Sequence, residues 1–564
     1  MSSEVIVGID LGTTNSAVGV VESGFPILLA DEEGRRLLPS AVWYGKEEEV
    51  EVGWTAKRRL ALGGVVTSIK RLMGQEARAE EVSAEILKKL KRIAEHRLEQ
   101  PISKAVITVP AYFNEAQRGA TKRAGELAGL EVVRLLSEPT AAALAYGLGK
   151  MGELQRVAVY DLGGGTFDVS ILEMREGQFE VQSTAGDTRL GGDDFDRLLA
   201  SMVLGDDWEK GRDSLESARV MEEAERVKVT LSEQETATFR LPFLASGPVE
   251  KEISRREFEA GLTDFLKKTE ACCRRAMADA GLEPAGIDAV VLAGGSTRVP
   301  AVREKVEAIF QRKVEEGVDP DESVGLGAAI QAGIISGAVR EVVLLDVTPL
   351  SLGIETVGGL MNVIIPRNTT IPCKAGEMFT NAAAGQRSMR LRVLQGEREL
   401  AGDNWELGAV EVPFEAEGKG QARVGVQFSL DANGMLEVLA RDTKTGVDTV
   451  LTIETAAVDV TDERVEQMVS ESVEHAFADM RARVFTEAKL KAEELLNSLE
   501  PALALAGEDL EEGELSAIRA AEARVRKEIE GGASNGPLLK AAVEELDQAS
   551  ERLAALVVEK AMGL

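Results

Sequence analysis

The 564-residue sequence is poor in histidine, cysteine and aromatic residues. Its two histidines, His96 and His475, argue against a Ser-His-Asp triad or a histidine-rich metal site. Its three cysteines, Cys272, Cys273 and Cys373, are odd in number and predict no disulfide framework, which favours a reducing, cytoplasmic compartment. Chemistry must then rest on carboxylates, lysine, hydroxyls and backbone N–H groups, a set that suits phosphoryl transfer.

Long apolar runs and an excess of positive charge are also missing. No apolar run approaches the roughly 20 residues that span a bilayer, and the first residues lead at once into a strand-like run instead of a signal peptide. The net charge of −31 argues against nucleic acid or an anionic membrane as the main partner. With 44% apolar residues, the length predicts a globular chain of several domains.

The stretch from Val157 to Ser170 organises the rest of the sequence. One apolar run stops at Asp161, the glycines 163–165 follow, and a second run begins after Thr166 and Asp168. This pattern predicts a β-hairpin whose glycine N–H groups face an anion, with the two aspartates placed to orient a divalent cation or water. A plain glycine-rich turn explains the stretch equally well when it is taken alone.

The start of the chain repeats this plan. Residues 5–16 form an apolar run that ends in Asp10, Gly12 and small hydroxyl residues, and a second apolar run follows. The repetition suggests two related halves whose hairpins hold a polyphosphate from both sides. A third run, 289–300, also stops at glycines, and ligands of open α/β sheets bind at such strand ends.

Charged residues elsewhere allow two interpretations each. Lys70 lies among apolar residues and meets either a ligand phosphate or solvent, and the local pattern alone favours a surface lysine. Glu138 lies at a predicted strand-to-helix junction, as a site carboxylate or as a helix N-terminal charge. Glu225, Lys228 and Ser232 share one helix face, which is either a binding face or a solvated one.

The pattern changes at Val342. The apolar run 342–345 predicts a domain boundary that binds one domain in one state and lies free in another, although a buried strand of a continuous domain fits the pattern comparably. Residues 350–458 predict an antiparallel β domain that binds rather than catalyses. Residues 461–564 predict helices, with Thr461 as the first N-cap.

Six motifs together point to one family; they are residues 8–16, 109–118, 138–146, 161–168, 294–300 and 344–356. On these motifs the chain resembles the seventy-kilodalton heat-shock chaperones of DnaK type, and the match weakens in the helical tail. Single motifs recur in sugar kinases and actin-like proteins. The resemblance implies an actin-like α/β ATPase domain (1–340), an apolar linker (341–349), an antiparallel β-sandwich that binds substrate (350–459) and an α-helical lid (460–564).

The resemblance also implies a function and a set of site residues. The expected activity is ATP-dependent binding of short apolar segments of unfolded polypeptides, with Mg-ATP hydrolysis switching the affinity for peptide through the linker. The implied catalytic residues are Lys70, Glu138, Asp161 and Thr166, with Lys70 at the γ-phosphate or attacking water. The implied metal ligands are Asp10, Asp161 and Asp168.

The remaining implied positions bind nucleotide or peptide. Those around the nucleotide are Gly12, Thr13, Thr14, Asn15, Gly164, Gly165, Gly192, Glu225, Lys228, Ser232, Gly295, Ser296, Arg298 and Asp321. Those of the peptide cleft are Ile354, Thr356, Val357, Phe379, Ala382, Met389 and Leu391. The implied cofactors are ATP, Mg²⁺ and K⁺. The implied partners are unfolded polypeptides, a J-domain co-chaperone and a nucleotide exchange factor, with no nucleic acid and no membrane.

The sequence departs from the family pattern at three places. The segment between Lys70 and Pro110 is short, which puts contacts with exchange factors in doubt. Val229 stands where many members carry a basic residue on the adenine, and Met389 replaces a smaller apolar residue of the peptide pocket. The alternative functions are a small-molecule kinase of the same superfold and a degenerate nucleotide-binding regulator. The β domain and linker argue against the kinase, and the intact catalytic set argues against the regulator.

Overall fold

The computed structural model describes residues 5–562 apart from 46–48, 149, 151–153, 211, 246, 318, 340–341, 417 and 453–475. The chain divides into two compact units, which we describe separately. Unit 1 comprises Met1–Ser351, Ile365–Phe379 and Val424–Glu463, and unit 2 comprises Leu352–Ile364, Thr380–Arg423 and Arg464–Leu564. The predicted four-part division stays a prediction, and the predicted N-cap Thr461 lies outside the described residues.

The first lobe of unit 1 is built on a sheet with the strand order β3-β2-β1-β8-β9, from which β4 branches by pairing with β2. Its strands are β1 (Ile6–Asp10), β2 (Asn15–Glu22), β3 (Phe25–Leu28), β4 (Leu38–Pro39), β8 (Lys104–Val109) and β9 (Glu131–Ser137). Strand β1 pairs antiparallel with β2 and parallel with β8, so the predicted first hairpin is confirmed. Helices α2 (Ala77–Leu98) and α3 (Glu115–Leu127) bury apolar residues in the same core as this sheet.

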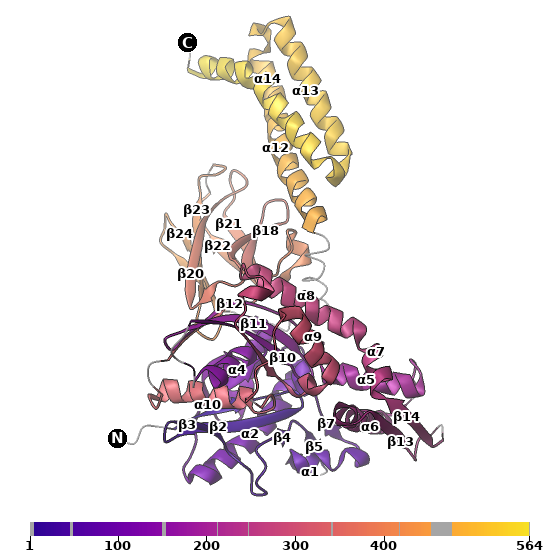
Figure 1. Ribbon diagram of the computed structural model, residues 1–564. Coiled ribbons are helices and arrows are strands. Elements are labelled where there is room, and N and C mark those ends of the chain that lie inside the picture. Colours follow the sequence, from indigo (N-terminus) through magenta and orange to yellow (C-terminus); the bar gives the residue numbers. More distant parts are fainter. Residues whose placement is uncertain are drawn as a thin grey trace. The chain divides into compact units, whose positions relative to one another are not determined.

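The second lobe repeats this plan in a sheet with the order β15-β10-β11-β12-β16-β19. Its strands β10, β11 and β12 are labelled in Figure 1. The strands are β10 (Gln155–Leu162), β11 (Phe167–Arg175), β12 (Gln178–Asp187), β15 (Ala289–Ala293), β16 (Val343–Val347) and β19 (Thr370–Ile371). Strands β10 and β11 form the predicted hairpin, in which Asp161 lies opposite Asp168. A core of buried residues from this sheet, α5 (Gly192–Leu204), α6 (Ser214–Glu233) and α8 (Thr263–Asp279) supports the lobe.

Two helices rich in small residues form the contact between the lobes. Helix α4 (Glu138–Gly147) packs on strands of the second sheet, and α10 (Ser323–Ser336) packs on strands of the first. A Cβ on Gly327 would lie 1.8 Å from the carbonyl oxygen of Ala141, and one on Gly8 would lie 2.1 Å from the carbonyl carbon of Ala328. Because backbone meets backbone at both points, no side chain fits at either glycine.

The apolar run after Val342 becomes a strand of the second sheet. Strand β16 pairs in parallel with β12, with Leu344 opposite Phe179 and Leu345 opposite Glu180. Val342 is buried, whereas Val343 remains 53% exposed. Asp346 is buried and accepts a hydrogen bond from the Ser137 hydroxyl at 2.7 Å.

Unit 1 also holds the sheet β20-β23-β24-β25, made of Cys373–Thr380, Arg423–Leu430, Leu436–Asp442 and Asp448–Thr452. The turn between β23 and β24, with the sequence Asp-Ala-Asn-Gly, packs on the first lobe. The Asn433 carbonyl accepts from Arg118 at 3.2 Å, and the Asn433 side-chain oxygen accepts from the Leu135 N–H at 3.0 Å. The carboxylate of Glu115 accepts from the Leu436 N–H at 2.7 Å.

Unit 2 contains a sheet and a helical bundle. The sheet has the order β18-β17-β21-β22, made of Leu360–Ile365, Leu352–Thr356, Ser388–Gln395 and Trp405–Pro413. Helices α12 (Ala476–Ala506), α13 (Glu512–Glu530) and α14 (Gly536–Met562) enclose an apolar core of their own. The antiparallel strands and C-terminal helices predicted from the sequence are therefore present, and the sandwich arrangement of the two sheets stays a prediction.

Smaller elements complete the described chain. They are β5 (Val42–Tyr44), β6 (Val50–Val52), α1 (Trp54–Lys57), β7 (Val65–Val66), η2 (Ile69–Leu72), β13 (Thr236–Leu241), β14 (Val249–Ser254), α7 (Arg255–Gly261), η4 (Gly295–Arg298) and α9 (Pro300–Phe310), with short 3₁₀ turns at 60–62, 284–286, 401–403, 507–509 and 532–535. None of the described helices combines the length and apolar character that a membrane crossing requires.

Candidate active site

The glycine turns of the two hairpins touch each other. A Cβ on Gly164 would lie 1.9 Å from the hydroxyl oxygen of Thr14, and one on Gly165 would lie 2.8 Å from that of Thr13. Any larger residue would push the two turns apart. The contacts therefore bring the glycine turns of both lobes and the hydroxyls of Thr13 and Thr14 to one place, and backbone N–H and hydroxyl groups are the kind of groups that bind phosphate.

Four carboxyl groups, those of Asp10, Glu138, Asp161 and Asp168, lie at strand ends near these turns; Asp10 is half-buried and the other three are buried. Burial, followed by the charge of Glu138, raises the pKa of Asp10 to about 7 and that of Asp168 to about 8. The same causes raise the pKa of Asp161 well above its usual range. The Oδ2 atoms of Asp161 and Asp168 are buried and find no hydrogen-bond partner in the described part of the chain. Such a set favours a bound cation, which would supply the missing partners.

Lys70 is the cation of this cluster. It lies on η2, is 3% exposed, and forms an ion pair with Glu138, the first residue of α4. The local interpretation of Lys70 as a surface lysine is therefore wrong. Its ammonium also lies 5.9 Å from the centre of the Phe113 ring.

The chemistry of the set fits Mg²⁺ bound together with phosphate. The described residues contain no group of three or more His, Cys, Asp or Glu side chains arranged to hold a metal by themselves. Mg²⁺ in phosphoryl-transfer sites is typically held by one or two carboxylates, substrate phosphates and water, so it requires no complete protein cage.

The predicted adenosine residues lie on α6 and η4, except for Asp321, which lies in the turn before α10. Lys228 donates to Asp196 at 2.8 Å and to the Gly192 carbonyl at 3.0 Å. A Cβ on Gly192 would lie 2.5 Å from the Ser296 hydroxyl and 2.9 Å from the Lys228 ammonium, so these three predicted residues meet. Ser232 donates to the Lys228 carbonyl.

Two further predicted residues are linked by an ion pair. Arg298 contacts Asp321 at 2.7 Å and Asp319 at 2.5 Å, and Asp321 lies against Gly295. The predicted residues from 192 to 321 therefore form two neighbouring polar groups at the ends of β12 and β15.

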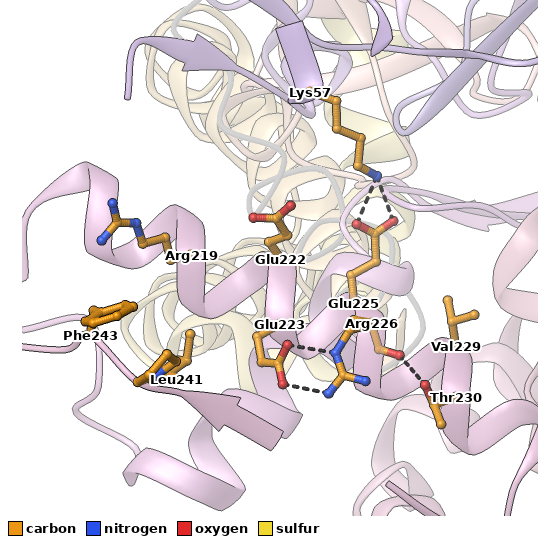
Figure 2. Close-up of a pocket in the computed structure, with 11 residues that line it drawn as sticks. Lys57, Arg219, Glu222, Glu223, Glu225, Arg226, Val229, Thr230, Leu241 and Phe243 are labelled. Carbon is orange, nitrogen blue, oxygen red and sulfur yellow. Dashed lines mark hydrogen bonds and ion pairs between the residues drawn. The ribbon is translucent and has the colours of Figure 1, made fainter. Parts of the chain in front are cut away.

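A cavity of about 710 Å³ lies beside helix α6 (Figure 2). Glu225 lines it and pairs with Lys57 at 3.2 Å. Val229 is 56% exposed there, and Leu241 and Phe243 form another apolar part of its wall. The cavity thus combines an apolar surface with charged groups next to the predicted adenosine positions.

A protein-family model described as Hsp70 protein matches residues 6–80 and 74–559. The chain belongs to the Hsp70 family. Members of this family are chaperones that hydrolyse ATP and generally bind unfolded polypeptides and co-chaperones. The match gives no support to the small-molecule kinase alternative.

Sequence reasoning missed four charged residues of this Hsp70 chain that lie next to the glycine turns. Arg71 contacts Asp194 at 2.8 Å and Asp193 at 3.8 Å, and Asp187 is buried at the end of β12. The only signals were the adjacency of Arg71 to Lys70 and of the aspartates to Gly192. Their pairing joins positions 71 and 194, which no local pattern connects.

The predicted peptide residues of this Hsp70 chain come from both units. Phe379 lies on β20 in unit 1, and the other six lie in unit 2. Ile354 and Leu391 are buried, whereas Val357 is 60% exposed. The remaining three have these surroundings: Thr356 donates to the Leu360 carbonyl, the Ala382 N–H donates to Gln386, and half-buried Met389 pairs with Val412.

Proposed function

We propose that this Hsp70 chain is an ATP-dependent molecular chaperone that binds short apolar segments of unfolded polypeptides and switches its affinity for them by Mg-ATP hydrolysis. The buried Lys70–Glu138 pair carries the proposal, because it lies with three further carboxyl groups beside the two touching glycine turns. A buried cluster of this composition is costly for the fold unless ligands complete it. The family match supports the same activity.

In this proposal the two turns bind the phosphates. Gly12, Thr13, Thr14 and Asn15 act from the first lobe, and Gly164, Gly165 and Thr166 act from the second. Asp10, Asp161 and Asp168 would hold Mg²⁺ directly or through water, and the ion when bound neutralises charge that develops on the phosphate oxygens. Glu225, Lys228, Ser232, Gly295, Ser296, Arg298 and Asp321 would bound the adenosine, with Val229 offering adenine an apolar surface.

Lys70 would stabilise the transferred phosphoryl group. Its ammonium is held by Glu138 and shielded from solvent, so its charge acts in a region of low dielectric constant. Glu138 would orient water near the phosphate while it holds the lysine in place. The chain has only two histidines, His96 and His475, and in this proposal catalysis rests on positioning and charge.

The peptide would bind in the β region, with Ile354, Thr356, Val357, Phe379, Ala382, Met389 and Leu391 as its contacts. The strand β16 supports a link between the nucleotide site and this region, because it pairs with β12 of the second lobe and leads directly into β17. We further propose a cytoplasmic location, K⁺ as an additional ion, and a J-domain protein and an exchange factor as partners.

The test is single-turnover ATP hydrolysis by Lys70→Ala. Losing one such electrostatic stabiliser should slow hydrolysis about 10²- to 10³-fold. Binding of a fluorescent ADP should remain close to that of the parent, because the turns that bind phosphate are unchanged.

Lys210→Ala is the matched control, since Lys210 is 79% exposed and pairs only with Asp207 at 2.6 Å among the contacts described. It should hydrolyse ATP at the parent rate. Near-normal hydrolysis by Lys70→Ala, or the absence of Mg²⁺-dependent hydrolysis in the parent, would contradict the proposed function.

A further inference from the structure

Arg71 crosses from one lobe to the other directly beside the glycine turns. It follows Lys70 on η2, which belongs to the first lobe, and its side chain is only 15% exposed. Its Nη2 atom lies 2.8 Å from Oδ2 of Asp194 in the first turn of α5, which belongs to the second lobe. The same atom lies 3.5 Å from the Gly164 carbonyl oxygen.

A second contact runs beside the first. The hydroxyl of Ser68 donates to Oδ2 of Asp193 at 2.8 Å, and the same carboxylate oxygen lies 3.8 Å from Nε of Arg71. Ser68 adopts a left-handed conformation with φ of 52°, which costs energy for a residue other than glycine. That conformation places the hydroxyl where it can reach α5.

The acceptors are held firmly on the second lobe. Oδ2 of Asp194 also accepts from the Gly191 N–H at 2.8 Å, so the carboxylate fixes the start of α5. A Cβ on Gly165 would lie 2.9 Å from Nε of Arg71, which places the guanidinium directly against the second glycine turn. The position of Arg71 is therefore fixed by both the turn and the helix.

We propose that Arg71, with Ser68, is a positioning residue that holds the two lobes closed over bound nucleotide. The ion pair with Asp194 fixes the helical turn that carries Lys70 against the second glycine turn, and nucleotide leaves only when this pair separates. This inference rests on the proposed nucleotide-binding function. In this inference Arg71 controls how long the nucleotide stays bound, and it does not control the rate of the hydrolysis step.

The experiment measures release of a fluorescent ADP from the intact chain by stopped flow. Arg71→Ala and Asp194→Ala should each speed release at least about tenfold, the value of one charge-assisted hydrogen bond. The double variant should release no faster than the faster single variant, because both changes break the same pair. Arg71→Lys keeps the positive charge but loses the planar set of N–H donors of the guanidinium. Its rate of ADP release should therefore lie between those of the parent and Arg71→Ala.

Arg197→Ala is the matched control. Arg197 contacts the same Asp194 carboxylate at 3.4 Å, but it lies on α5 itself and makes no link to the first lobe in the contacts described. Its loss should leave ADP release unchanged. The proposal would be overturned if the effects of Arg71→Ala and Asp194→Ala on ADP release were additive, or if Arg197→Ala accelerated ADP release equally.

A ligand-free measurement separates this inference from the proposed function. Hydrogen–deuterium exchange of the nucleotide-free protein should show faster exchange at residues 191–196 in Arg71→Ala than in Arg197→Ala. If the parent binds no nucleotide, the proposed function fails while this comparison still tests the contact. Unchanged exchange in Arg71→Ala shows that the contact does not hold the lobes and overturns the inference.

Discussion

The charge of Lys70 is balanced by Glu138, which lies 68 positions away in the sequence. The residues around Lys70 in the sequence therefore do not predict its burial. Its neighbours are apolar, as they would be around a lysine that lies along a surface. The burial of Lys70 is compensated by the ion pair with Glu138, which lies at the junction of β9 and α4. Arg71 and Asp194 show the same limit, because the sequence contains no pattern that relates them.

Met389 offers a prediction at the scale of one side chain. The proposed peptide pocket is narrowed by this long, unbranched residue, which fills space and still adjusts. Met389→Val should therefore bind a peptide with a central leucine about fourfold more tightly, the value of one additional buried CH₂ group. Fluorescence anisotropy with matched leucine and alanine peptides measures the change.

Met562→Val is the control for this prediction, since Met562 is 69% exposed at the end of α14. It should leave both affinities unchanged. Identical peptide preferences for the parent and Met389→Val would show that Met389 does not line the cleft.

At the scale of elements, the sequence predicted most of the strands and helices but not all of their partners. The two hairpins, the α4 junction and the strands from β17 to β25 follow from apolar runs that stop at glycine, asparagine or aspartate. The helix face predicted for Glu225, Lys228 and Ser232 is part of α6, which begins at Ser214, where Asp213 accepts from the Glu216 N–H as its cap. The pairing of β16 with β12 joins segments far apart in sequence, and hydrophobic pattern carries no information about such a partner.

The β23–β24 turn on helix α3 should be sensitive to pH. Burial raises the pKa of Glu115 to about 7 from its usual 4.5, partly opposed by the Leu436 N–H and by Arg118, and reinforced by Asp431. Glu115 therefore binds a proton more tightly when the turn is docked on α3 than when it is undocked. This contribution to docking is complete below pH 4.5 and is lost as the pH rises through about 7, so docking should weaken about tenfold between pH 6 and pH 8.

Exchange of the Leu436 amide, corrected for its intrinsic rate, measures this effect. Glu115→Gln keeps an acceptor for that amide but does not titrate, so its docking should be nearly constant over the same range. If the parent and Glu115→Gln show the same pH dependence, another group controls the docking of the turn.

At the scale of the whole molecule, strand β16 is the segment that would connect the proposed nucleotide site to the proposed peptide-binding region. Leu344 packs against the core beneath β12, and Leu345 lies opposite Glu180. Changing both leucines to aspartate removes apolar contact and places a second carboxylate beside Glu180. ATP should then no longer speed the release of a labelled peptide, although ATP and peptide each still bind.

Val343→Asp is the control for the coupling prediction, because Val343 lies on the same strand but is 53% exposed. It should retain most of the acceleration. ATP-stimulated release that persists in the double leucine variant would mean that the strand only tethers the two regions.

The contact of α4 with α10 has a consequence for how the lobes move. At Gly327 the backbone of α10 meets the backbone of α4, and at Ala328 the backbone of α10 meets Gly8 of strand β1. A small displacement at these backbone contacts would disturb fewer side-chain contacts than the same displacement in the interdigitated cores on either side. We therefore expect the two lobes to move relative to each other about the contact of α4 with α10.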